Sequence, residues 1–390
     1  MQWTLDRCRE LYNAALDERK SVARRIVPIK FCGNIAILEP EKTIVHRQVS
    51  KLDQSRQLTE IKHELRPEYN EINDHVLRNV LERVDLAFKA FFRRVKAGEK
   101  SGYPRFQSYT RYDSFTYPDL QGWKVIPGEG RHAKLILSKI GTINVKLHRP
   151  IQGKIKTATI KREGEHWYVT FACEVESEAL PVSYEDVGID LGITHFAALS
   201  NGEMIDNPRH YRRAEKKLKQ LQQALARKKR GSHRRKKAAQ KVAKAHRKVR
   251  NQRKDFHHKE SRKLVNKYQV IVFEELQAAN LSKRPKPKQD ESGKYLPNGA
   301  ATKSGLNKSI RDAGWNSFTQ MVKAKAECAG RTIIFVDPKN TSQICSACGV
   351  KGPHKDLEER IHTCTYCGVV LDRDHNAALN ILALGHKQIA

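Results

Sequence analysis

The sequence lacks the features that would place a protein in or on a membrane. It has no run of about 18 apolar residues, the length that a membrane-spanning helix needs. It carries no lipidation motif, and no apolar segment of a signal peptide follows the first residues, MQWTLDRC. We therefore expect a protein that carries no export signal and does not have a membrane as its partner.

Acidic residues are scarce relative to basic ones. The 390 residues include 74 Lys and Arg but only 43 Asp and Glu, which gives a net charge of +31. A field of this strength favours a polyanionic partner, and nucleic acid fits better than a lipid surface because the membrane signals are absent. The length predicts two or three domains, each with a real core.

Four of the eight cysteines form two Cys-x-x-Cys pairs near the C-terminus. Cys345 and Cys348 make the first pair, Cys364 and Cys367 make the second, and 15 residues separate the two. This spacing predicts a zinc ribbon, in which four thiolates surround one Zn²⁺ and leave no open position, so the zinc would be structural. A redox Cys-x-x-Cys is the alternative, but it would need only one pair beside a thioredoxin-like βαβ unit.

The other four cysteines are scattered among apolar neighbours, where we expect buried thiols. A chain without a disulfide framework is typical of a reducing compartment, so we expect a cytoplasmic protein. These scattered cysteines are Cys8, Cys32, Cys173 and Cys328.

The N-terminal quarter has the apolar periodicity of helices. One helix is predicted over residues 3–20 and a second helical block from near Leu58, whereas residues 24–56 read as irregular. Within the second block a narrow apolar stripe predicts helix packing. The stripe consists of Leu77, Leu81, Val84, Phe88 and Phe91.

Aromatic and basic residues alternate where this helical block ends, from Phe91 to Phe106. Gly98, Gly102 and Pro104 terminate the helix there. Arginines among aromatic residues are compatible with contacts to phosphates and bases, and Arg105 is one candidate. A solvated helix end explains the same composition.

From Ser114 to Glu176 the pattern changes to short strands broken by Gly and Pro, which predicts a small antiparallel barrel or sheet. Gly164 marks the turn of a hairpin between two of these strands. The predicted strands are Lys134–Leu137, Thr142–Leu147, Thr157–Arg162 and Trp167–Glu174.

The remainder of the chain has an α/β order. An apolar strand beginning at Val187 carries Asp190 in its interior and leads into a hairpin through Asn201-Gly202. A carboxylate inside an apolar strand is costly unless it is paired or binds a cation. Further strands are expected at Val270–Leu276, ending in acids, and from Thr332, with helices between and after them.

Residues 209–263 form the most basic stretch of the chain. Its periodicity predicts one or two long helices with a break near Gly231-Ser232. A charge run is usually a solvated face, but a charge so one-sided would oppose folding without a polyanion. With Arg105, the candidate nucleic-acid contacts are Lys228, Lys229, Arg230, Arg234, Arg235, Lys236 and Lys237. The segment from Ser282 to Ser304, rich in Lys, Pro and Gly, predicts a mobile loop.

Three separate elements each contribute one carboxylate: Asp190, Glu274 and Asp374. Oxygen ligands of this kind suit Mg²⁺, and two such ions can activate a water and stabilise the leaving oxygen of a phosphodiester. Asp374 stands at the start of the last helix, where it is equally well explained as an N-cap.

The motifs, taken in order, resemble those of the TnpB (OrfB) proteins of bacterial insertion sequences, which are relatives of type V CRISPR effectors. The likeness covers nearly the whole chain. Its C-terminal motifs are Gly188-Ile-Asp-Leu-Gly-Ile, Phe273-Glu-Glu-Leu, the two Cys-x-x-Cys-Gly knuckles and Asp372-Arg-Asp-His-Asn-Ala-Ala-Leu-Asn-Ile. Its N-terminal motifs are Cys8-Arg-Glu-Leu-Tyr-Asn-Ala-Ala-Leu, Ala87-Phe-Lys-Ala-Phe-Phe-Arg-Arg and Tyr103-Pro-Arg-Phe.

The resemblance implies an α/β architecture: a RuvC-like nuclease domain of RNase H fold with an inserted zinc ribbon, preceded by a helical lobe and a small wedge β-barrel. We expect the following boundaries: the helical recognition lobe at 1–96, the wedge at 97–181, the nuclease core at 182–339 with basic helices at 209–267, the zinc ribbon at 340–371 and the end of the core at 372–390.

The resemblance also implies an RNA-guided, Mg²⁺-dependent DNA endonuclease of a transposable element, cutting beside a short flanking motif. Its partners would be a guide RNA and target DNA, with no small-molecule substrate, and its metals a structural Zn²⁺ and catalytic Mg²⁺. The cytoplasm would be that of a bacterium or archaeon, with the protein associated with the nucleoid. The implied magnesium ligands are Asp190, Glu274 and Asp374, with Asp372 as an outer neighbour. The alternatives are a nuclease-inactive RNA-guided repressor and a strand-transfer transposase.

The chain departs from the family pattern at its start. The family usually begins with a strand that ends in a basic segment, and this chain starts directly at the first predicted helix. That strand would belong to the wedge barrel. We expect either that the barrel closes without it or that the start is truncated.

Overall fold

The fold is described by a computed structural model that covers residues 1–24, 49–176, 179–353 and 359–389. The chain divides into two compact units, Met1–Glu176 and Ser177–Ala390. Each unit is described by itself below. Within the described ranges, no helix is both long and apolar enough to cross a membrane.

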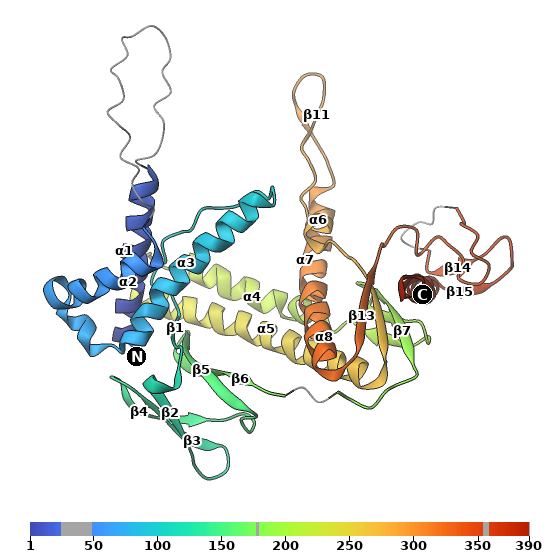
Figure 1. The fold of residues 1–390 in the computed structure, drawn as a ribbon. Helices are drawn as coiled ribbons and strands as arrows, with labels where there is room; N and C mark the ends of the chain where they lie inside the picture. The colour runs from blue at the N-terminus through green and yellow to red at the C-terminus, as the bar shows by residue number, and fades with distance from the viewer. Residues whose placement is uncertain (25–48, 177–178, 354–358, 390) are drawn as a thin grey trace, which may run out of the picture. The chain divides into compact units, whose positions relative to one another are not determined.

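The N-terminal unit begins with helices (Figure 1). α1 (Gln2–Arg24) matches the predicted first helix, and α3 (Asp74–Lys96) contains the predicted apolar stripe. α2 (Lys51–Glu60) starts seven residues before the expected Leu58, because Ser50 and Asp53 form a capping box that fixes its first turn. A π-helical turn (Ile61–Leu65) and a 3-10 turn (Pro67–Glu71) connect α2 to α3.

The apolar stripe of α3 packs into the core, as predicted, and only its last member, Phe91, is half-buried. α3 packs against α1 and against β1 (Ser114–Tyr117). Helices and strands of this unit share one hydrophobic core that runs from Leu5 to Ile160. The regions predicted as lobe and wedge therefore form a single compact unit.

The strands of the N-terminal unit make two antiparallel sheets of three strands each. The first has the order β1-β5-β6, with β5 at Lys154–Glu163 and β6 at His166–Glu174. The second consists of β2 (Trp123–Pro127), β3 (His132–Leu137) and β4 (Gly141–Lys146), preceded by a 3-10 turn at Leu120–Gly122. The predicted hairpin is present as β5–β6, with Gly164 at φ +65° in its turn.

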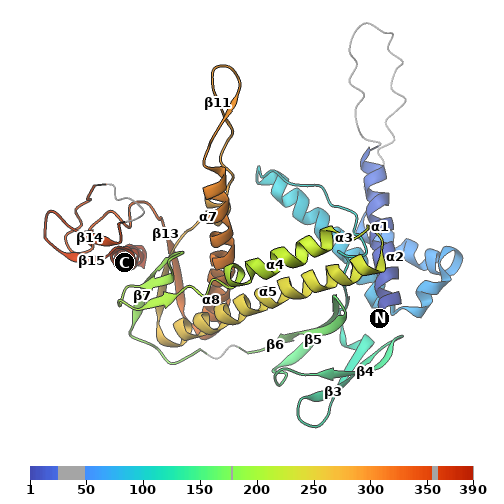
Figure 2. The same ribbon diagram turned by 180° about the vertical axis from the view of Figure 1, so that it is seen from behind.

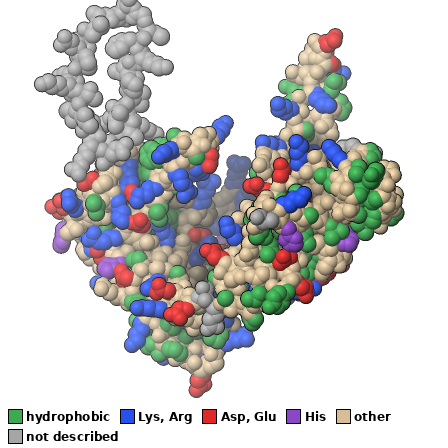
Figure 3. Space-filling view, turned by 45° about the vertical axis from the view of Figure 1, so that its right-hand side comes forward, with side chains coloured by type: hydrophobic (Ala, Val, Ile, Leu, Met, Phe, Trp, Pro, Cys, Tyr) green, Lys and Arg blue, Asp and Glu red, His purple; other side chains and the backbone are tan. Residues whose placement is uncertain are grey.

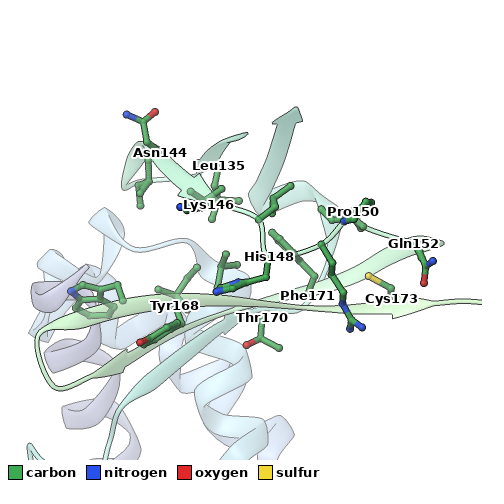
Figure 4. Close-up of a pocket in the computed structure, with 18 of the residues that line it drawn as sticks. Leu135, Asn144, Lys146, His148, Pro150, Gln152, Tyr168, Thr170, Phe171 and Cys173 are labelled. Carbon is green, nitrogen blue, oxygen red and sulfur yellow. The ribbon is translucent and has the colours of Figure 1, made fainter. Parts of the chain in front are cut away.

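A groove of about 670 Å³ separates β3 and β4 from β6 (Figure 4). Apolar side chains of both sheets line it, among them Leu135 and Phe171. Lys146, His148 and Arg149 add basic groups along the segment that leaves β4. None of the predicted acidic residues lines this groove.

The C-terminal unit is built on a five-stranded sheet of order β13-β10-β7-β8-β9 (Figures 1 and 2). β7, β10 and β13 are parallel, whereas β8 and β9 continue the sheet as an antiparallel hairpin through Asn201-Gly202, as predicted. The strands are β7 (Asp186–Leu191), β8 (His195–Leu199), β9 (Met204–Asp206), β10 (Val270–Glu274) and β13 (Thr332–Val336). The mixed α/β order predicted from the sequence is confirmed.

Long helices follow the hairpin. The basic stretch forms α4 (His210–Ala226) and α5 (His233–Lys267), and the break between them includes Gly231 at φ +82° and Ser232 as the N-cap of α5. The predicted break is therefore confirmed. The remaining helices are α6 (Ala278–Leu281), α7 (Ala300–Ala313), α8 (Trp315–Ala329) and α9 (Arg373–Ile389).

The last helix lies directly on the sheet. α9 contacts β7, β10 and β13, and glycine is required at two of these contacts. A Cβ at Gly188 of β7 would lie 2.2 Å from the backbone oxygen of Ala378, and one at Gly385 would lie 2.4 Å from a methyl group of Val272. This close approach holds α9 against the sheet, so that Asp374, at the start of α9, lies near Asp190 of β7.

Two expectations are corrected. The segment predicted as a loop at 282–304 contains a short hairpin, β11 (Lys288–Gln289) with β12 (Tyr295–Leu296), and α7 already starts at Ala300. Asp290 closes the hairpin turn by accepting the backbone N–H groups of Ser292 and Lys294. In Figure 3 this hairpin stands out from its unit, with Lys and Arg along its sides and acidic side chains at its tip.

The second correction concerns the scattered cysteines. Cys8 is buried, and burial raises the pKa of its thiol to about 12, as expected of a core residue. Cys173 is only half-buried, because it lies at the end of the inner face of β6, where it lines the groove between the two sheets. Cys328 is exposed on the outward side of α8. Cys32 lies outside the described residues.

Candidate functional site

The four paired cysteines converge at one point. All four sulfur atoms lie within 4.8 Å of one another, and the Cys345–Cys367 and Cys348–Cys364 sulfur pairs are each 3.7 Å apart. Thiolates about 2.3 Å from a tetrahedral zinc would stand about 3.8 Å from each other, which agrees with this spacing. The cluster is therefore consistent with the predicted zinc ribbon.

The two knuckles have the same backbone structure. In the first, the N–H of Gly349 donates to the carbonyl of Cys345, and in the second the N–H of Gly368 donates to the carbonyl of Cys364. Both glycines have φ +74°, which is the reason for glycine after each pair. Backbone N–H groups of Cys367 and Tyr366 lower the pKa of the Cys364 thiol to about 6, which favours the thiolate that a metal binds.

The zinc ribbon is fastened to α9 by amide side chains. Asn376 accepts the backbone N–H of Ser346 at 2.9 Å and donates to the carbonyl of Ile344 at 2.8 Å. Asn380, one turn later, donates to the carbonyls of Thr341 and Ile344. The ribbon strands, β14 (Ile361–Thr363) and β15 (Val370–Asp372), run directly into α9.

The three predicted carboxylates come from different elements of the same unit. Asp190 lies near the end of β7, Glu274 is the last residue of the neighbouring parallel strand β10, and Asp374 is in the first turn of α9. Burial and the charges of Glu274 and Asp374 raise the pKa of Asp190 well above its usual range. The fold thus brings into one acidic site three residues that are far apart in the sequence.

The pKa values of the other two acids are raised as well. Burial raises the pKa of Glu274, although a hydrogen bond from the Thr341 hydroxyl opposes the rise, and burial followed by the charge of Asp372 raises that of Asp374. Carboxylates in such a setting ionise at a cost that a cation would remove. Hard oxygen donors of this kind fit Mg²⁺.

The carboxylates are spaced more widely than the thiols. Over the described ranges, the four cysteines are the only group of three or more potential ligands whose atoms all lie within 4.8 Å of one another. Like charges repel, so three carboxylates, of which Glu274 is buried and the other two are half-buried, are not expected to close on one another as four thiols do. The acidic site is therefore a wider arrangement than the closed cysteine cluster, and we call it open in this sense.

The structure assigns the helix cap to Asp372. Its Oδ1 accepts the backbone N–H groups of Asp374 at 2.8 Å and His375 at 3.1 Å. The N-cap role that the sequence left open for Asp374 is therefore filled by its neighbour. Asp374 is half-buried, and its carboxylate lies 3.8 Å from the guanidinium of Arg360.

Two residues of the site were not predicted. Arg360, just before β14, lies beside Asp374 and also donates to the Thr194 hydroxyl at 2.8 Å. Thr341, after β13, is buried and donates to the carboxylate of Glu274. Neither residue belongs to a recognisable motif, and only the pairing of β14 with β15 and the parallel register of β13 with β10 place them here.

The predicted basic contacts lie around the α4–α5 turn. Lys228, Lys229 and Arg230 are exposed in the turn, and Arg234, Lys236 and Lys237 are exposed in the first turns of α5. Arg235 differs, because its guanidinium donates to the carbonyls of Leu225 and Lys228 and thereby caps α4. Arg105 is exposed in the N-terminal unit.

Comparisons with known proteins agree with these features. Residues 170–284 match a family model described as OrfB, "Probable transposase", and residues 315–381 match the Cas12f1-like TNB domain. The chain is 31% identical over 315 residues to "Putative RNA-guided DNA endonuclease InsQ" of Escherichia coli K12, covering 80% of this chain and 75% of that protein.

Two further similarities were found. A "Putative RNA-guided DNA endonuclease" of Streptomyces pristinaespiralis is 33% identical over 354 residues, covering 87% of this chain and 78% of the relative. The Cas12f1 chain in a cryo-EM complex of Cas12f1 with sgRNA and target DNA superposes with a TM-score of 0.57 at 14% identity, over 97% of this chain and 81% of that one. At this identity the superposition shows a shared fold.

Proposed function

Since this chain belongs to the TnpB (OrfB) family, we propose that it is an RNA-guided DNA endonuclease encoded by a transposable element. Its substrate is DNA matched to a guide RNA, cut beside a short flanking motif by a RuvC-like nuclease centre. The observation that carries the proposal is the acidic site formed by Asp190, Glu274 and Asp374. The pKa of each of the three carboxyl groups is raised, and the charges of Glu274 and Asp374 contribute to the rise at Asp190.

In this proposal the three carboxylates hold Mg²⁺. When bound, the metal pair supplies a hydroxide for attack on the phosphodiester and stabilises the leaving oxygen. Thr341 orients Glu274 through its hydroxyl, and Asp372 fixes the first turn of α9 on which Asp374 stands. Arg360 is placed to orient Asp374 and to meet the negative charge of a phosphate.

The zinc ribbon has a supporting role in this scheme. Four thiolates complete the coordination of Zn²⁺, so the zinc has no position for substrate. The ribbon strands lead into α9, and Asn376 and Asn380 tie α9 to the first knuckle. The ribbon would thereby hold Asp374 and Arg360 in position.

In this proposal the positively charged protein binds guide RNA and target DNA by electrostatic attraction to their phosphates. Lys and Arg side chains are visible on both units in Figure 3. Sequence specificity would come from base pairing, with the protein contacting the backbone and the flanking motif. The exposed cations of the α4–α5 turn would contact phosphates.

Replacing the three acids one at a time tests the nuclease assignment. We expect Asp190→Ala, Glu274→Ala and Asp374→Ala proteins, loaded with guide RNA, to bind the matched DNA but to cut it at least about a hundredfold more slowly, because loss of a ligand exceeds the effect of losing an outer contact. The measurement is the rate of guided cleavage at saturating Mg²⁺.

The matched control is Asp206→Ala. Asp206 is a carboxylate of the same sheet, in β9, and its side chain is 97% exposed, so its loss should leave cleavage unchanged. Parental cleavage rates in all three acid variants would overturn the assignment. Joined DNA strands among the products would instead indicate a strand-transfer transposase.

A further inference from the structure

Four aromatic rings gather at the C-terminal end of α3 and in the loop that follows it. We call this cluster the aromatic ridge. The ring centroids of Phe91 and Tyr103 are 5.0 Å apart, and those of Phe91 and Phe92 are 5.2 Å apart. The members of the ridge are Phe91, Phe92, Tyr103 and Phe106.

Most of the ridge is open to solvent. Phe92 is 51% exposed, Phe106 is 47% exposed and Tyr103 is 39% exposed. Burying these side chains would stabilise the fold, but the chain leaves all three rings partly in contact with water. Adjacent exposed rings are typical of a binding surface.

The simplest alternative is that the rings only anchor the loop, but fewer rings suffice for that. The loop turns back from α3 toward α1 (Figure 1), where Gln107 and Asn13 exchange two hydrogen bonds of 2.8 and 3.0 Å. Buried Phe88 meets the edge of Tyr103 at 5.6 Å. These contacts fix the loop while Phe92 and Phe106 remain half exposed.

The surroundings of the ridge are strongly basic. Arg93, Arg94 and Lys96 are exposed in the last turn of α3, and Lys100 and Arg105 are exposed in the loop. Between residues 91 and 109, Glu99 is the only acid in the sequence. Cations beside exposed rings complement a ligand that has both phosphates and flat bases.

One ring face already attracts a cation. The ammonium group of Lys20, from α1, lies 4.1 Å from the centroid of Phe106 and 5.7 Å from that of Tyr103. A lysine side chain is long and flexible, so it can turn from the ring to a neighbouring phosphate. Positive charge therefore lies against a ring of the ridge as well as in the neighbouring residues of α3 and the loop.

We propose that the aromatic ridge is a binding site for unpaired nucleotides, with bases stacking on Phe92 and Phe106 and phosphates contacting the surrounding Lys and Arg. The proposal extends the proposed function, because a guided nuclease must handle single strands of RNA or DNA. Bases within a duplex already stack on each other and offer no free face to a side chain. Unpaired strands are therefore the ligand that fits the ridge.

The test compares single strands with a duplex. The probes are a uridine homopolymer, a thymidine homopolymer of equal length and a blunt-ended, two-stranded duplex with the same number of phosphates, all bound to the full-length protein without Mg²⁺. We expect the Phe92→Leu/Phe106→Leu double variant to bind both single strands about tenfold more weakly for each ring lost, and the duplex almost unchanged. Leucine keeps the positions apolar but removes the flat faces.

The salt dependence separates stacking from charge. Loss of stacking should lower the affinity equally at every salt concentration, whereas an Arg93→Gln/Arg94→Gln variant should flatten the slope, because fewer counterions are released. Each variant is also made together with neutral substitutions in the α4–α5 turn, so that binding there does not mask the ridge. An effect confined to one homopolymer identifies RNA or DNA as the source of the nucleotides.

Two controls guard against an effect on folding. Leu86→Ala removes an apolar side chain that is 53% exposed on the same helix, and it should bind like the parent. Phe92→Trp/Phe106→Trp keeps flat faces and should bind at least as well as the parent. An equal loss on duplex and single strands, failure of tryptophan to restore binding, or no loss at all would overturn the proposal.

These outcomes are independent of the nuclease assignment. The probes carry no guide and the buffer contains no Mg²⁺, so a protein that never cuts DNA would still reveal the ridge. Conversely, a protein that cuts guided DNA normally but binds the single strands equally well in the leucine variant would refute the ridge alone.

Discussion

The two candidate metal sites of the C-terminal unit differ in what holds their ligands together. The cysteine cluster is local and closed, since two hydrogen-bonded knuckles place four sulfurs within 4.8 Å. The acidic site is assembled by topology from β7, β10 and α9, and its carboxylates remain farther apart. A closed site can serve structure, whereas an open site of repelling charges leaves room for a substrate.

Removal of the zinc ligands should have the largest effect. We expect Cys364→Ala/Cys367→Ala protein to lose the one zinc per chain that the parent carries, because two thiolates do not make a closed tetrahedral site. Loss of the ribbon should also loosen the start of α9, so guided cleavage should fall with it. The measurements are metal analysis and proteolysis near residue 372.

Cys328→Ala is the matched control for the zinc experiment. Cys328 is an exposed thiol in α8 with no place in the cluster, so its loss should leave the zinc content at one per chain. Full zinc retention in the double variant would show that the two knuckles do not bind the metal together.

Asp372 and Asp374, at the start of α9, allow a metal ligand to be compared with a helix cap two residues away. We expect Asp374→Ala to reduce cleavage at least about a hundredfold, and Asp372→Ala about tenfold or less, because Asp372 caps the helix and acts on the site only through its first turn. Asp372→Asn should retain most of the activity, since an amide oxygen can also cap. An inactive Asp372→Asn beside an active Asp374→Ala would exchange the two roles.

The same contrast explains what the sequence could predict. The knuckles, the hairpin at Gly164 and the break at Gly231 depend on residues that are close in sequence, and all were confirmed. Arg360 and Thr341 were missed, because their place depends on strand pairing and on the path of the chain after β13. Long-range placement leaves no local pattern.

Other predictions were wrong because the local sequence pattern was misinterpreted. The start of α2 was placed too late, because its signal is the polar capping box at Ser50 rather than an apolar stripe. The hairpin at 288–296 was taken for a loop, because Pro and Lys obscure a turn that the side chain of Asp290 closes. Cys328 was expected in the core, but its helix turns that side outward.

The smallest expected effect is on the stability of the folded protein. It distinguishes a site of repelling carboxylates from a set of acids paired with cations. Burial first, and the charges of Glu274 and Asp374 second, raise the pKa of Asp190 in the folded protein above its unfolded value. A group of this kind contributes stability that is fully present below the unfolded pKa and is lost as the pH rises through the folded pKa. At neutral pH without Mg²⁺, Asp190 should therefore make the fold less stable than it is in acid.

We accordingly expect Asp190→Asn to raise the melting temperature of the Mg²⁺-free protein at neutral pH, by about 2–4 °C for each kcal/mol relieved in a unit of this size. The difference from the parent should shrink as the pH falls, because the parent then protonates Asp190 and loses the repulsion. Acid also weakens the zinc cluster, but it does so in both proteins, so the difference between them isolates the carboxylate. Glu327→Gln, at an exposed position of α8 in the same unit, should show no such pH-dependent difference. A lower melting temperature for Asp190→Asn at every pH would mean that Asp190 is held by favourable contacts, and the description of this site as open and repulsive would be wrong.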